Sequence, residues 1–147
     1  MNPHIVLRVV SKVLLPPIIL FALYVQFHGD FGPGGGFQAG VIFAVGFILH
    51  GLVFGLDATK RVIPPDLLRS LMALGVVLYA GVGVVTLLLG ANYLDYDVLS
   101  EDIEHHAGQH YGIILVELGV GITVAAVMLM LFYLFGSRTN EMRDRDW

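Results

Sequence analysis

Three long segments of this chain contain no charged residue, and this absence most restricts what the chain can fold into. No Asp, Glu, Lys or Arg occurs in residues 31–56, 70–94 or 118–137. A helix that crosses a membrane needs about 20 predominantly apolar residues, and each segment is long enough. The apolar stretch before them is interrupted only by Arg8 and Lys12. The sequence therefore predicts four membrane-spanning helices.

The composition agrees with a membrane protein and excludes several other classes. Apolar residues make up 56% of the chain and charged residues 14%, against roughly 25% charged in soluble domains. The few basic residues form no patch, so a nucleic-acid partner is not expected. Absence of cysteine excludes disulfides and Cys-ligated metals. No nucleophile–base constellation is present, so we expect neither an enzyme nor a cofactor.

The expected fold is an all-α integral membrane protein, with one membrane domain over residues 1–147. The four helices are expected at about 5–27, 37–56, 67–90 and 111–135. The linker between the third and fourth spans is acidic and contains histidines. A short surface helix is predicted within it, at 98–106.

The basic residues predict the orientation. With four spans, all 8 Lys and Arg residues fall on the side of the two termini and the second linker. They are Arg8, Lys12, Lys60, Arg61, Arg69, Arg138, Arg143 and Arg145. Because basic loops stay in the cytoplasm, both termini are predicted to be cytoplasmic.

A glycine-rich turn between the first two spans is the most unusual motif. It lies on the predicted outer side, at a membrane boundary, and irregular backbone there needs cover from protein or water. We expect a rigid wedge that docks on partner subunits. Its structural residues are His28, Gly29, Pro33, Gly34, Gly35, Gly36, Phe37 and Gly40.

Glu117 is an acidic side chain inside the last span. It follows Tyr111 by six residues, about 9 Å of helix. A carboxylate at that depth must pair, become protonated or face water. Glu117 is therefore either a group that handles a cation or proton, or a structural acid that ties two helices together.

Three further polar residues are candidates for an ion pathway. Lys12 and His50 lie near the inner end of the first two spans, where Pro16 and Pro17 free backbone carbonyls. Lys12 can instead extend to the headgroups, and His50 can be a packing residue. Gln38 can hydrogen-bond loose carbonyls near the start of the second span.

The outer linker contains His105, His106 and His110, which could suggest a metal site. No third ligand with suitable geometry is evident, although Asp102 and Glu104 are near. Surface histidines are the preferred interpretation, and no metal site is predicted.

Two strings carry a family resemblance. Phe-His-Gly at 27–29 precedes Pro-Gly-Gly-Gly-Phe-Gln-Ala-Gly at 33–40, and Val-Glu-Leu-Gly-Val-Gly-Ile-Thr-Val follows at 116–124. The chain resembles, over nearly its whole length, the B subunit of Mrp-type multisubunit Na+/H+ antiporters (the MrpB/MnhB family). One difference is Tyr111, which stands where the last helix of the family often has an aspartate.

The resemblance implies an accessory subunit of a Na+/H+ antiporter in the plasma membrane of a prokaryote. It implies assembly with about seven kinds of subunit, and a role in the cation route and the subunit interface. The alternative is a structural membrane subunit of a hydrogenase- or complex I-related redox complex, without an ion contact of its own.

Overall fold

Six helical elements make up the chain in this computed structural model, which describes residues 5–29, 32–100 and 107–138. They are α1 (Ile5–His28), α2 (Gly36–Phe54), α3 (Leu56–Val62), α4 (Pro65–Leu88), the short 3₁₀ helix η1 (Tyr96–Leu99) and α5 (Ala107–Arg138). Within the described part of the chain, the 4 long helices are apolar enough to cross a membrane, and no strand occurs. The predicted all-α membrane fold is confirmed.

Seven of the eight ends of the long helices differ from the expected positions, by one to four residues. The second span ends at Phe54 instead of residue 56, because Gly55 has φ 99° and turns the chain into α3. A residue with a side chain rarely adopts that backbone conformation. The last helix begins at Ala107, four residues earlier than expected. In contrast, α1 continues through Pro16 and Pro17 as one helix.

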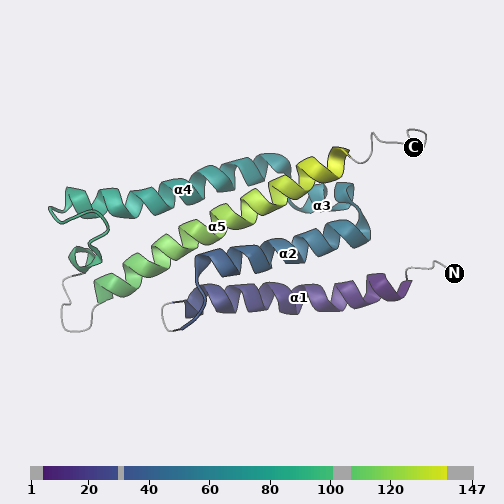
Figure 1. The fold of residues 1–147 in the computed structure, drawn as a ribbon, viewed down its shortest axis with the longest axis horizontal. Helices are drawn as coiled ribbons and strands as arrows, with labels where there is room; N and C mark the ends of the chain where they lie inside the picture. The colour runs from purple at the N-terminus through teal and green to yellow at the C-terminus, as the bar shows by residue number, and fades with distance from the viewer. Residues whose placement is uncertain (1–4, 30–31, 101–106, 139–147) are drawn as a thin grey trace.

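The long helices lie side by side in the order α1, α2, α5, α4 (Figure 1). The end of the bundle where α1 begins and α5 ends also holds α3 and the start of α4. The basic residues of α1, α3 and α4 belong to this end. The glycine-rich turn and η1 lie towards the other end. This arrangement suits the predicted topology, and the assignment of the basic end to the cytoplasm stays a prediction.

The buried core lies where α2, α4 and α5 meet, in the half of the bundle nearer α3. It is formed by Ala44, Leu68, Ala126, Leu129 and Tyr133. Large apolar side chains on the outer surfaces of the helices remain exposed, above all along α1. Such a surface is suited to lipid tails or to other membrane helices.

The helices α4 and α5 approach each other closely at two glycines. A β-carbon at Gly75 of α4 would lie 2.6 Å from the carbonyl oxygen of Gly119 in α5. The two helices therefore approach almost backbone to backbone, as small residues allow in membranes. A glycine allows this close approach, but the sequence does not specify which helix makes it.

Candidate site at Glu117 and the glycine-rich turn

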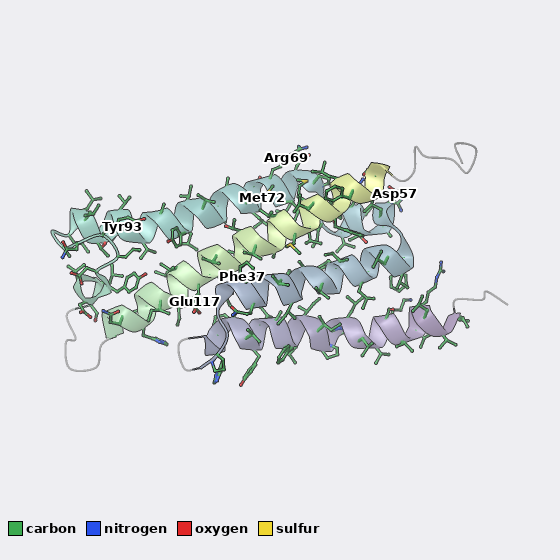
Figure 2. The ribbon with its side chains drawn as sticks, viewed as in Figure 1. Phe37, Asp57, Arg69, Met72, Tyr93 and Glu117 are labelled. Atoms are coloured by element: carbon green, nitrogen blue, oxygen red, sulfur yellow. The ribbon has the colours of Figure 1, made fainter. Side chains whose placement is uncertain are left out.

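The glycine-rich turn packs directly against Glu117. A β-carbon at Gly35 would lie 2.8 Å from the Glu117 Oε1 atom, and one at Gly29 would lie 2.7 Å from it. A β-carbon at Gly36 would overlap the Glu117 carbonyl oxygen. Figure 2 shows Phe37 and Glu117 where the start of α2 meets α5. The sequence singled out the turn and the acid separately, and the structure joins them in one site.

The turn lies deeper in the bundle than the ends of α4 and α5 that lie near η1. Glu117 follows Ala107, the first residue of α5, by roughly ten residues, which is about 15 Å of helix. The α1–α2 hairpin therefore ends well short of the first residues of α5 (Figure 1). The sequence places the turn at the membrane boundary and Glu117 below it. In the structure both lie at the same level.

The Glu117 carboxylate lies at the amino-terminal end of α2. Gly35 is the N-cap of that helix, with φ 111° and no side-chain hydrogen bond to the helix. The first helical bond runs from the Ala39 N–H to the Gly35 carbonyl at 3.0 Å. Backbone N–H groups and the helix dipole give this end partial positive charge. A negative charge on Glu117 is therefore placed where the backbone favours it.

Gln26 belongs to the same region, and the sequence analysis missed it. Its side chain is only 8% exposed, and its Oε1 atom contacts Gly121, one helical turn after Glu117. Its Nε2 atom is buried and has no hydrogen-bond partner among the described residues. One signal was available: an amide stands between apolar residues inside the first span, just as Glu117 does in the last.

The other predicted turn residues surround this contact. His28 stacks on Tyr24, with ring centroids 5.1 Å apart. Gly34 packs against Val25, and a β-carbon at Gly40 would lie 2.6 Å from the Gly121 carbonyl oxygen.

The remaining predicted residues of the turn face outward. Pro33 and Phe37 are exposed, as is Gln38, the pathway candidate from this region. The Gln38 Oε1 atom lies 3.9 Å from the position of a Gly35 β-carbon.

Lys12 and His50 lie at the opposite end of the hairpin and do not join the Glu117 site. His50 Nδ1 and Thr59 Oγ1 are 2.8 Å apart, and the fully buried Thr59 hydroxyl also donates to the Gly55 carbonyl at 3.2 Å. Phe54 lies between the two candidates, 4.8 Å from the His50 ring and 5.7 Å from Lys12 Nζ. If His50 is a packing residue, Thr59 is its hydrogen-bond partner.

The outer linker contributes no metal site within the described residues. His105 and His106 lie outside those residues, as does most of the short helix expected at 98–106; η1 covers Tyr96–Leu99. Burial raises the pKa of the Tyr96 phenol, and Tyr79 and Tyr93 raise it further.

Among the described residues, four apolar helices long enough to cross a membrane, with the acid Glu117 packed against a glycine-rich turn, define an all-α membrane protein. The chain belongs to a known family of this class. A model described as a domain related to the MnhB subunit of Na+/H+ antiporter matches residues 6–130. This confirms the resemblance seen in the sequence motifs.

Two relatives illustrate the similarity. A Staphylococcus haemolyticus protein, provisionally named antiporter subunit mnhB2, is 34% identical over 131 residues, covering 86% of this chain and 90% of its own. A Staphylococcus aureus protein with the same provisional name is 31% identical over 137 residues, covering 92% of this chain and 96% of its own. The similarity extends over most of both chains.

Proposed function

We propose that this chain is an accessory membrane subunit of a multisubunit Na+/H+ antiporter. It would work in the plasma membrane of a prokaryote, with both termini in the cytoplasm and about seven kinds of subunit in the complex. Family membership supports the antiporter assignment, because the matching model and the relatives carry that description. The even number of spans and the basic residues at one end support the orientation.

We further propose that Glu117 handles a cation or a proton for the complex. The observation that carries this proposal is the contact between its carboxylate and Gly29 and Gly35. A carboxylate in a span is costly unless it is functional or paired, and here the start of α2 favours its charge. The shortened hairpin leaves the outer part of α5 uncovered by α1 and α2 (Figure 1).

The test is a comparison of Glu117→Gln with Glu117→Asp in the co-expressed complex. Gln keeps the shape and loses the charge, whereas Asp keeps the charge on a shorter side chain. We expect Glu117→Gln to lower Na+-driven proton movement in everted vesicles severalfold, with a normal amount of complex on a native gel. Glu117→Asp should retain more exchange.

Full exchange in Glu117→Gln with normal assembly would show that the acid is structural. Loss of the assembled complex in Glu117→Gln, with normal assembly in Glu117→Asp, would show that the charge is needed for assembly.

A further inference from the structure

A groove of about 450 Å³ lies between α1 and α2, in the half of the bundle nearer α3. Its walls are large apolar side chains, among them Leu15, Ile19 and Leu20 of α1 and Phe47 of α2. The His50 ring also lines it. The groove is therefore an apolar channel with a polar group near the end that faces α3.

Lys12 stands at the same end of this groove. It precedes Leu15 and Pro16 by three and four residues, the spacing that places side chains on one face of a helix. Its Nζ atom lies 5.7 Å from the centre of the Phe54 ring of α2, and that ring lies 4.8 Å from the His50 ring. The ammonium group of Lys12 thus reaches from α1 across to α2 at the end of the groove.

The depth of Lys12 follows from the packing of α1 on α5. Gln26 of α1 contacts Gly121, which lies close to the middle of α5. The two helices run in opposite directions (Figure 1), and Lys12 precedes Gln26 by about 21 Å of helix. The hydrocarbon core is about 30 Å thick, so a core centred on α5 ends about 15 Å from its middle. Lys12 therefore lies at the level of the lipid headgroups, and the groove runs from there into the core.

The change of polarity along the groove matches that of a phospholipid. An apolar channel leads to a cation at headgroup level, just as an acyl chain leads to a phosphate. Lys12 forms no ion pair with a described residue, whereas Arg69 at the same end of the bundle pairs with Asp66. A lysine at this level attracts the negative charge of anionic lipids.

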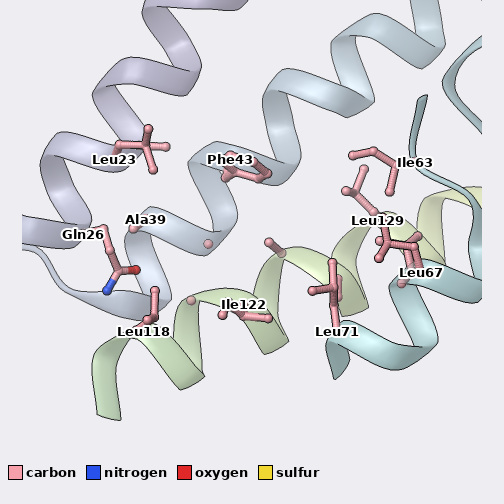
Figure 3. Close-up of a pocket in the computed structure, with 16 residues that line it drawn as sticks. Leu23, Gln26, Ala39, Phe43, Ile63, Leu67, Leu71, Leu118, Ile122 and Leu129 are labelled. Atoms are coloured by element: carbon pink, nitrogen blue, oxygen red, sulfur yellow. The ribbon is translucent and has the colours of Figure 1, made fainter. Parts of the chain in front are cut away.

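A helix of another subunit suits this groove less well. Membrane helices pack closely through small residues, but leucine, isoleucine, proline and phenylalanine side chains form these walls. Small residues do form the floor of a different groove, beside Gln26, and no charged side chain lines that one (Figure 3). Of these two grooves, the one between α1 and α2 joins an apolar channel to a cation.

We propose that the α1–α2 groove binds one anionic phospholipid, with an acyl chain along its apolar walls and the phosphate at Lys12. The His50 ring, held by the 2.8 Å hydrogen bond between its Nδ1 atom and Thr59, forms the wall next to Lys12. The site is independent of the role proposed for Glu117. Lipid binding is measured without ion exchange, so a fully active Glu117→Gln variant would leave this inference standing.

The first test uses a photo-crosslinking amino acid at Leu20, which is exposed and lines the groove. The matched control is its neighbour Phe21, which is exposed at nearly the same depth but is not part of the groove lining. The subunits are co-expressed, the membranes are irradiated, and the adducts are identified by mass spectrometry. Anionic phospholipid should be enriched about fivefold at Leu20 relative to Phe21, the factor expected of one lysine near the membrane surface. A protein adduct at Leu20, or the same lipid mixture at both positions, would overturn the proposal.

The second test changes the charge. Lys12→Gln should abolish the enrichment of anionic lipid at Leu20, and Lys12→Arg should keep it, because the positive charge remains. The control is Lys60→Gln, which removes a cation from the same end of the bundle; Lys60 Nζ bonds Ser137 Oγ of α5 at 3.0 Å, away from the groove. Lys60→Gln should leave the enrichment unchanged. An equal loss in both Gln variants would reveal a general surface attraction in place of a site, and an unchanged enrichment in Lys12→Gln would also contradict the proposal.

Discussion

Gly36, the first residue of α2, packs against the backbone of Glu117 so closely that a β-carbon would overlap its carbonyl oxygen. A β-carbon at Gly35, the N-cap before it, would lie 2.8 Å from the Oε1 atom of the Glu117 carboxylate. The two glycines thus bring the start of one helix against the backbone and the acid of another. The following predictions test this contact and the fold around it.

Replacing Gly36 by Ala should impair assembly. The added β-carbon must displace backbone of α5, and overpacking of this kind costs about 1–3 kcal/mol. The matched control is Gly81→Ala in α4, where a β-carbon meets nothing within 4 Å. Native gels should show less complex for Gly36→Ala and an unchanged amount for Gly81→Ala. Equal, normal assembly of both would show that the space beside Glu117 adapts freely.

Gly35→Ala and Gly55→Ala separate backbone strain from packing. Both glycines have positive φ, 111° and 99°, but only Gly35 has a neighbour at the β-carbon position. Each alanine should therefore carry a similar conformational cost, about 1–3 kcal/mol, because a positive φ with ψ of −179° or 152° is a region nearly restricted to glycine. Gly35→Ala should lower assembly and exchange further, through its contact with Glu117. If assembly and exchange fall by the same small amount in both variants, Gly35 is needed only for its backbone conformation and not for its contact with Glu117.

Thr59→Val should destabilise the complex by about 1 kcal/mol, because the buried hydroxyl bonds both His50 and the Gly55 carbonyl. Thr59→Ser keeps the hydroxyl and should be milder. Thermal inactivation of the purified complex measures the loss. The pH profile of exchange should not move if His50 is a packing residue, and a shifted profile in Thr59→Val would instead place His50 on the ion route.

Single cysteines can test the topology, since the chain has no cysteine of its own. Asp57 and Asn92 are exposed and lie in the second and third linkers, whereas Thr59 is buried and would label poorly. In intact cells a membrane-impermeant maleimide should label Asn92→Cys and not Asp57→Cys. The reverse pattern would invert the predicted orientation.

The chain alone should not exchange Na+ for protons. Among its described residues, it contributes one acid well inside a span, Glu117, which does not make a path across the membrane by itself. Reconstitution of the purified subunit in liposomes should give no exchange above empty vesicles, while the co-expressed complex should be active. Robust exchange by the subunit alone would refute the accessory role.

Much of the fold was open to prediction because hydropathy is local. The three charge-free segments, and the apolar stretch around Arg8 and Lys12, predicted the four spans. The end of the second span was missed because it depends on one backbone angle, at Gly55. The site was only half predictable. Glu117 and the turn stood out as residues unsuited to lipid, but nothing in their spacing showed that they touch. Gln26 carried the same signal more weakly, since an uncharged amide is cheaper in a membrane than a carboxylate.

The sequence by itself determined which segments cross the membrane, because that depends on runs of neighbouring side chains and their cost in lipid. It also determined that the turn must be protected. The tertiary structure decided the level at which α1 and α2 pack along α5, and so brought Gly35, Gly36 and Gln26 to Glu117 and Gly121. That offset comes from contacts between residues far apart in the chain. No local pattern specifies it, because each glycine allows close approach without selecting its partner.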